Sequence, residues 1–347
     1  MSVLTGIILH AIGAGSASLC YTPQKKTKQW SWQTYWLAQA VVCWLVLPLL
    51  VAWITIPKLT TVLQEAPRSA MLSSFVLGAA YGIGGTAFGI AIRYIGFSLT
   101  YAFSIGISCV LGTLLPPIIH GQFMNVFNKI GGIYILAGVA VGIIGIILCG
   151  ISGRMKEKDL SEIEKTTAVF DMKRGLPLCI LAGILSAFFG LSLDQGAPIA
   201  EIANKYGAGV YSGNVIYIFS NTGAFFSTLI YCLYLHKKHQ TFKEFVNLSG
   251  STTSFALPVN YILAIITGTL WYCQFFFYGL GHVRLGAYQF TSWAIHMIIL
   301  VLFSSVVGLI MKEWVFAKPK TIRILTAALL VLLFAVIILT YGNYLGS

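Results

Sequence analysis

The stretch of the sequence from Phe245 to Gly281 carries no charged side chain. Since about 20 apolar residues suffice for a helix to cross the hydrocarbon core of a bilayer, this stretch is long enough for a complete crossing. Within it, Trp271, Gln274 and Tyr278 follow the spacing i, i+3, i+7 and therefore share one face of a helix. A polar atom without a hydrogen-bonding partner is costly in lipid, so this face is expected to point toward other helices or a water-filled cavity. Such a face is typical of the lining of a transporter.

The composition is that of an integral membrane protein. Hydrophobic residues make up 57% of the 347 residues and charged residues only 9%. Soluble domains contain about 25% charged residues. The net charge of +12 does not indicate nucleic-acid binding, because the basic residues lie in short loops between apolar runs, where they determine topology. We therefore expect a lipid bilayer, and no nucleic acid, among the partners.

The seven cysteines fall within apolar segments, and none forms a CxxC pair or lies near a cluster of histidines. They are expected to be small buried hydrophobes and not disulfide partners or metal ligands. The first apolar run, 3–21, lacks both a preceding basic segment and an obvious cleavage site. It is therefore expected to be a retained helix and not a signal peptide.

Charged segments divide the chain into ten apolar runs, which predicts an all-α integral membrane protein with ten transmembrane helices. The predicted spans are 3–21, 34–56, 69–91, 97–119, 130–151, 175–193, 208–235, 254–280, 285–311 and 323–345. The fifth and tenth contain almost no polar side chains over their central turns, which suits contact with lipid or pairing between helices.

Basic residues are distributed unequally between the two sets of loops that these spans separate. One face carries 17 of the 22 lysines and arginines, including Lys25, Arg154 and Lys237, and the other carries five. Because cytoplasmic loops are enriched in basic residues, the first face is predicted to be cytoplasmic, with both termini outside the cytoplasm.

A densely charged segment, 153–174, is predicted to be a solvated, cytoplasmic linker between a first half, 1–152, and a second half, 175–347. Each half then contains five spans. An odd number of spans reverses the insertion direction, which predicts two inverted five-helix repeats, as found in secondary transporters. The pattern Gly-x-x-Ser-Ala occurs at Gly13 in the first span and again at Gly183 in the sixth.

Polar stripes at helical spacing occur in several spans: Asn214, Tyr217 and Asn221 in the seventh; Gln289, Ser292, Trp293 and His296 in the ninth; Tyr101, Ser104 and Ser108 in the fourth. One interpretation is hydrogen bonding between helices, worth about 0.6 kcal/mol per contact. The other is sugar recognition, in which aromatic rings cover the C–H face of a sugar and amides bind its hydroxyl groups. The candidate substrate-binding residues are Trp271, Gln274, Tyr278, Asn214, Asn221, Tyr217, Trp293 and Tyr101.

Three titratable side chains are candidates for carrying a coupling proton: His10 and His296 first, and Asp194 after them. An imidazole has a pKa of about 6.5 and changes charge within the physiological range. A buried histidine is otherwise a neutral, hydrogen-bonded core residue. A carboxylate needs deep burial to remain protonated at neutral pH, and Asp194 is predicted to lie at a helix end within reach of water. No cofactor other than the proton is expected.

Five motifs resemble the bacterial L-rhamnose–proton symporter family of the drug/metabolite transporter superfamily. They are Cys20-Tyr-x-Pro23, Arg93-Tyr-x-Gly96, Gly112-Thr-Leu-x-x-Pro117, Trp271-Tyr-x-Gln274-Phe-Phe-Phe-Tyr278-x-x-Gly281-His282 and Gly308-Leu-x-x-Lys312-Glu313-Trp314. The resemblance extends from the first span to the ninth. It implies two five-helix halves and proton-driven uptake of a 6-deoxy-hexose, most specifically L-rhamnose, across a bacterial inner membrane.

His10, Gln274, Tyr278, His282 and His296 fall on positions that are similar to those of this family. The chain departs from the family pattern at two segments: Asp194-Gln195-Gly196, where an uncharged amide is expected, and Gly84-Gly85-Thr86-Ala87, which is less polar. Both segments belong to spans expected to line the cavity, and the identity of the sugar depends on them.

Other functions remain to be compared with sugar–proton symport. An exporter or exchanger of metabolites from the same superfamily would share the fold. An intramembrane enzyme would need a nucleophile with a base or clustered metal ligands, and the sequence has neither spacing. A sensor or scaffold that does not transport is a further class. The oligomeric state, the stereochemistry of the sugar and the stoichiometry are left open by the sequence.

Overall fold

The computed structural model describes residues 3–121, 123–164, 171–246, 256–312 and 314–345. Within these ranges the regular structure is helical and contains no strand. The longer helices are α1 (Val3–Leu19), α2 (Trp32–Ala40), α3 (Leu47–Thr55), α5 (Arg68–Ile119), α7 (Gly132–Glu164), α8 (Met172–Gln195), α9 (Ala197–Lys205), α10 (Asn214–His239), α11 (Ala256–His282), α12 (Ser292–Ile310) and α13 (Pro319–Leu345). The shorter elements are η1 (Pro23–Lys26), η2 (Val41–Val46), α4 (Leu59–Glu65), α6 (Phe123–Asn128), η3 (Gly209–Tyr211), η4 (Phe242–Phe245) and η5 (Gly286–Thr291).

Ten of the described helical segments are long and apolar enough to cross a membrane, which confirms the predicted number of spans and the all-α membrane fold. The helix α5 contains two of them, Arg68–Ile95 and Thr100–Ile119. A straight helix of its 52 residues would be about 78 Å long, more than twice the thickness of the hydrocarbon core, so it cannot be one crossing. The second span combines α2, α3 and the π-helical segment η2 between them.

The chain forms two compact units, which do not coincide with its two halves. The first unit comprises Met1–Ser18, Gly84–Leu191 and Phe277–Ser347, and the second comprises Leu19–Ile83 and Ser192–Phe276. Each unit draws segments from both halves. The boundaries fall near the ends of α1 and α8 and within α5 and α11, which are corresponding points of the first and sixth and of the third and eighth spans. Two related five-helix halves would produce such a pattern; the inverted repeat itself remains a prediction.

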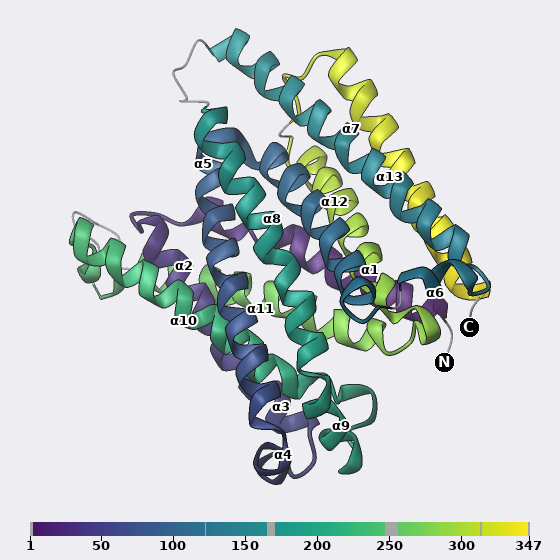
Figure 1. Cartoon of the computed structure of the whole chain (residues 1–347). Helices are drawn as coiled ribbons and strands as arrows, with labels where there is room; N and C mark the ends of the chain where they lie inside the picture. Colours follow the sequence, from purple (N-terminus) through teal and green to yellow (C-terminus); the bar gives the residue numbers. More distant parts are fainter. Residues whose placement is uncertain (1–2, 122, 165–170, 247–255, 313, 346–347) are drawn as a thin grey trace. The chain divides into compact units, whose positions relative to one another are not determined.

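In the first unit, α7 and α13 lie side by side along most of their length (Figure 1). Glycines make the close approach possible. A methyl group built on Gly138 would lie 2.6 Å from the side chain of Leu339, and one built on Gly145 would lie 2.6 Å from that of Leu332. Small residues let helix backbones approach in a membrane, where van der Waals packing drives association. Of the two roles expected of the fifth and tenth spans, contact with lipid or pairing between helices, the structure shows pairing.

The charged segment after the fifth span begins as a helix, because α7 continues without a break to Glu164. Two charged residues of this extension are buried: Lys156, whose ammonium lies 4.9 Å from the centre of the Trp314 ring, and Asp159. A fully solvated linker was expected for this part of the chain, and contacts with the segment before α13 explain the difference. Residues 165–170 of the predicted linker lie outside the described residues.

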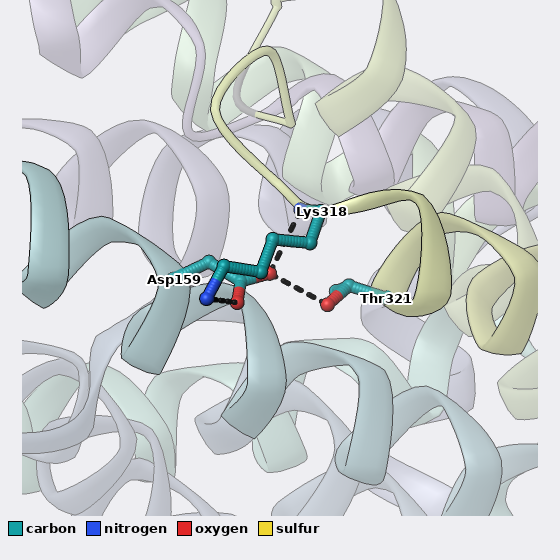
Figure 2. Close-up of polar contacts among 3 residues, drawn as sticks. All are labelled: Asp159, Lys318 and Thr321. Carbon is teal, nitrogen blue, oxygen red and sulfur yellow. Dashed lines mark hydrogen bonds and ion pairs between the residues drawn. The ribbon is translucent and has the colours of Figure 1, made fainter.

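Asp159 forms hydrogen bonds and an ion pair with residues at the beginning of α13, as Figure 2 shows. Its Oδ2 accepts hydrogen bonds from the backbone N–H of Lys318 at 2.9 Å and from the hydroxyl group of Thr321 at 2.6 Å, and the Lys318 ammonium lies 3.8 Å from Oδ1. The first N–H groups of a helix have no partner within the helix, and their partial positive charge favours an anion there. The carboxylate of α7 therefore acts as the cap of α13.

The second unit repeats this arrangement at the beginning of α2. The Glu244 carboxylate accepts hydrogen bonds from the backbone N–H and the hydroxyl of Ser31, both at 2.7 Å, and from the hydroxyl of Thr34 at 2.5 Å. In both units the acid binds a backbone N–H and a hydroxyl group three residues further on. Both capped helices begin on the predicted cytoplasmic face, and both acids lie in segments predicted for that same face.

Replacing Asp159 with alanine should lower the stability of the protein by about 1–2 kcal/mol, since it removes a helix cap and leaves the Thr321 hydroxyl without its acceptor. The measurement is unfolding of the purified protein in detergent with increasing denaturing surfactant. Glu201→Ala is the matched control, because Glu201 is exposed on α9. Equal destabilisation by both variants would contradict the assigned role of Asp159.

Candidate functional site

Two histidines and a tyrosine form a buried triangle in the first unit. His10 of α1 and His296 of α12 have ring centres 5.7 Å apart, and Tyr278 of α11 lies 5.3 Å from the first and 5.5 Å from the second. Both histidines are completely buried. The structure thus brings together the two histidines that the sequence analysis selected as proton carriers. Whether they carry a proton is not decided by their positions and remains a prediction.

The imidazole nitrogens of this triangle are buried without hydrogen-bonding partners among the described residues. This holds for Nδ1 and Nε2 of His10 and for Nδ1 and Nε2 of His296. A neutral imidazole presents one donor and one acceptor, and leaving either unsatisfied costs free energy. The alternative interpretation, a structural histidine held by hydrogen bonds, predicts partners that the described part of the chain does not supply. The arrangement suits a group that binds a proton or a polar ligand.

Glycines let α1 and α11 approach each other at this point. A methyl group built on Gly281 would lie 2.9 Å from the carbonyl oxygen of Gly6 and 2.9 Å from the His10 ring. Real Cβ atoms do not come so close to backbone, so a larger residue at Gly281 would force the two helices apart. The close approach explains how His10 reaches Tyr278.

A third histidine and a tryptophan extend the triangle. The His282 ring stacks on Tyr278 with 5.8 Å between ring centres, and its Nδ1 lies 3.0 Å from the hydroxyl oxygen of Ser292. The Trp293 ring meets Tyr278 edge-on at 5.7 Å. Its indole N–H donates to the carbonyl oxygen of Ser108 at 2.9 Å, so this donor already serves a contact between helices. Tyr101 also lies in the first unit, where it packs edge-on against Phe88.

In the second unit, Trp271 lies among three other aromatic side chains. Its ring centre is 5.5 Å from that of Tyr21, 5.5 Å from that of Trp36 and 5.3 Å from that of Trp44. Trp36 in turn stacks on Trp32 at 4.9 Å. The sequence analysis selected Trp271 and missed the tryptophans around it. Their signal was available, because Trp32, Trp36, Gln39 and Cys43 follow one another at helical spacing within a span.

Polar atoms without partners accompany these aromatic rings. Both amide atoms of Gln39 and the indole nitrogens of Trp36 and Trp44 are buried and have no hydrogen-bonding partner among the described residues. Gln39 is completely buried and directly precedes the end of α2, where the π-helical segment η2 begins. Such π-helical segments are frequent at functional sites. Gln274 is buried on α11, one turn after Trp271, as the sequence predicted.

The polar stripe of the seventh span is buried on α10, and its members differ in what they bind. Asn214 donates to the hydroxyl oxygen of Thr55 at 3.0 Å, and the Tyr217 hydroxyl donates to the carbonyl oxygen of Phe275 at 2.7 Å. These two side chains hold helices together. The side-chain nitrogen of Asn221 has no partner among the described residues, so Asn221 is the member of the stripe best suited to bind a ligand.

The carboxylate candidate for the coupling proton, Asp194, lies at a helix end, as expected. Asp194 is the second-last residue of α8, is half-buried, and accepts a hydrogen bond from the side chain of Gln195 at 3.4 Å. It belongs to the second unit, whereas both histidines belong to the first. Glu201 is exposed on α9. Glu313 lies outside the described residues. Of the titratable candidates, His10 and His296 are therefore the most deeply buried.

The cysteines are free thiols; six are buried and Cys273 is half-buried, in agreement with their expected role as small hydrophobes. In the part of the chain that the structure describes, no three histidine, cysteine, aspartate or glutamate side chains are grouped so that they could hold a metal ion.

Comparison with known proteins supplies independent evidence. Residues 1–344 match the model of the L-rhamnose-proton symport protein family. The chain is 33% identical over 345 residues to the L-rhamnose-proton symporters of Yersinia pestis (strain Pestoides F) and Yersinia pseudotuberculosis serotype O:1b, and the match covers 98% of this chain and 98% of each relative. It is also 33% identical over 343 residues to the L-rhamnose-proton symporter of Citrobacter koseri, again with 98% of both chains covered.

Proposed function

Since this chain belongs to the L-rhamnose–proton symport protein family, we propose that it is a secondary active transporter that imports L-rhamnose together with a proton across a bacterial inner membrane. The observation that carries the proposal is a match over essentially the whole length of the chain and of its relatives. The ten helices that are long and apolar enough to cross a membrane carry buried polar and aromatic side chains, which supports the proposal.

The test is uptake of labelled L-rhamnose by right-side-out membrane vesicles that contain the protein, with and without an imposed proton gradient. Accumulation above the external concentration only when protons flow inward supports the proposal. Uptake that merely equilibrates the sugar, or outward movement against a gradient, would identify an exchanger or exporter of the same superfamily. L-fucose and D-glucose as competitors examine how strictly the sugar is selected.

We assign the coupling proton to the His10–His296 pair. Coupling requires that binding of the proton changes the affinity for the sugar, and by thermodynamic linkage the sugar must change the proton affinity of the same group by an equal factor. Imidazoles change charge near neutral pH. The two rings meet edge-on in the interior of the first unit, and no described residue forms a hydrogen bond with their nitrogens. Two neighbouring imidazoles would not readily be charged together, which suits a site that binds a single proton.

Sugar contact is assigned to the group around Trp271 in the second unit. Its indole and those of Trp36 and Trp44 offer apolar rings, while the amides of Gln39 and Gln274 offer donors and acceptors for hydroxyl groups. Asn221 is a further candidate. Tyr278, Trp293 and Tyr101, which lie in the first unit, keep the role of sugar contacts only as a prediction from the sequence.

Replacing His10 or His296 with glutamine should preserve exchange of sugar down its gradient and abolish accumulation driven by a proton gradient, because glutamine retains polarity and cannot titrate. Both activities are measured in the vesicles described above. His239→Gln, at the exposed end of α10, is the matched control and should accumulate sugar normally. Normal accumulation by both histidine variants, with its loss in Asp194→Asn, would move the proton site to the carboxylate.

Replacing Gln274 with leucine preserves bulk and removes the amide, so a sugar hydroxyl group loses its partner. The apparent affinity for L-rhamnose should fall by about ten- to a hundredfold, corresponding to about 1–3 kcal/mol. Gln64→Leu on the exposed surface of α4 serves as the control. Unchanged affinity in a correctly inserted Gln274→Leu protein would remove this residue from the sugar site, and loss of stability with normal affinity would make it a structural contact.

We propose that both termini lie outside the cytoplasm, on the basis of 17 against five basic residues in the two sets of loops. Contacts within each unit join segments assigned to the same face: Asp159 with Thr321 on the basic face, and Glu65 with Tyr206 on the other. A reporter that is active only in the cytoplasm should be silent when fused after Ser347 and active when inserted in the linker 165–170. A bright signal from the C-terminal fusion would show that the C-terminus lies in the cytoplasm and that the proposed orientation is wrong.

A further inference from the structure

A groove of about 600 Å³ lies entirely within the first unit, separate from the histidine triangle. The second span of α5, from Ala102 to Leu111, forms one wall; α7 from Ile143 to Arg154 and α8 from Met172 to Ile184 form the others. The lining is apolar with one exception, the guanidinium group of Arg154 at one end. Several lining side chains are exposed, including Phe103 at 36%, Ile147 at 55% and Ile180 at 42%.

The length of the groove matches one leaflet of a bilayer. From Ile143 to Arg154 the helix rises by about 16 Å, and from Met172 to Ile184 by about 18 Å. Half of the hydrocarbon core is about 15 Å. The helices run so that Ala102, Arg154 and Met172 lie at one end of the groove, and the close contact of Gly150 with Ala102 agrees with this direction. An acyl chain therefore fits along the groove from its polar end to the middle of the membrane.

The charged side chains at the Arg154 end of the groove determine which kind of ligand group can bind there. Arg154 is exposed, and its guanidinium forms no ion pair with a described residue. The carboxylate nearest in sequence to the start of α8, Asp171, is already paired with Arg174 at 3.2 Å. Lys173 is a second exposed cation beside Met172. A guanidinium binds a phosphate group through two parallel hydrogen bonds, and basic pockets between helices on the cytoplasmic side of membrane proteins bind anionic head groups.

We propose that this groove is a binding site for an anionic phospholipid, with an acyl chain along α5, α7 and α8 and the phosphate group at Arg154. The groove combines a continuous apolar lining, the length of one leaflet and one cationic lining residue at its end, which is the chemistry of one amphiphile with a negative head. A second copy of the chain would bring an apolar helix face and leave the guanidinium without a counter-charge.

The test is native mass spectrometry of the full chain, purified in a neutral detergent and depleted of lipid, with phosphatidylglycerol or phosphatidylcholine of identical acyl chains. The wild-type protein should retain more phosphatidylglycerol than phosphatidylcholine. Arg154→Gln should lower the affinity for phosphatidylglycerol by about tenfold, to the level of phosphatidylcholine, because a charge-assisted contact is lost. Arg323→Gln is the matched control: Arg323 is exposed on α13, lies on the same predicted face and does not line the groove.

Ile147→Trp narrows the groove without changing its charge and should weaken binding of both lipids, and inorganic phosphate should not displace phosphatidylglycerol. Three results would overturn the proposal. Arg154→Gln and Arg323→Gln could respond alike, which would make the attraction a general effect of surface charge. Inorganic phosphate could compete with the lipid, which would make Arg154 a site for a free anion. Ile147→Trp could convert a dimer to a monomer, which would make the groove an interface between copies.

Discussion

Every polar atom in the interior of a membrane protein needs a partner within the protein, because the hydrocarbon around it supplies none. Helices satisfy this requirement along their length and leave it open at their ends. The capped ends of α2 and α13 show how this chain meets it: carboxylates from remote segments bind the free N–H groups and the neighbouring hydroxyls. Serine, asparagine and tyrosine side chains within the spans bind carbonyl or hydroxyl oxygens of other helices in the same way.

The exceptions to this rule among the described residues include members of both candidate sites. In the first unit they include the ring nitrogens of His10 and His296, and in the second they include polar atoms of Gln39, Trp36 and Trp44. Unsatisfied polar groups destabilise a protein unless a ligand or proton compensates them. One group suits the proposed proton and the other the proposed sugar. Both candidate sites include residues of α11, where Gln274 and Tyr278 are one helical turn apart. A single helix thus carries members of both candidate sites.

The spans and the polar stripes could be predicted from the sequence, because hydropathy and helical spacing are local properties. That the fifth and tenth helices pair with each other could not, because their apolar faces suit lipid equally well. The sequence indicated that His10 and His296 both lie in the interior, but it did not indicate that their rings contact each other. Other features depend on contacts between residues far apart in the chain. Nothing near Asp159 indicates that its partner is Thr321, and the charge of that segment led to the expectation of a solvated linker. The aromatic group around Trp271 has a recognisable helical spacing at Trp32, Trp36 and Gln39. It was missed because tryptophans in a membrane span are common and become informative only when their polar atoms are found without partners.

The pairing of α7 with α13 also constrains the order in which the protein can be completed. Chains are synthesised from the N-terminus, and domains generally fold as units. The first unit contains segments from the beginning, the middle and the end of the chain, so it cannot close until the last span has left the ribosome. Until then the glycine face of α7 lacks Leu339 and Leu332, and Asp159 lacks the N–H and hydroxyl groups that it caps. A chain that terminates before α13 therefore exposes the Asp159 carboxylate and the glycine face of α7 together, which distinguishes it from the finished protein.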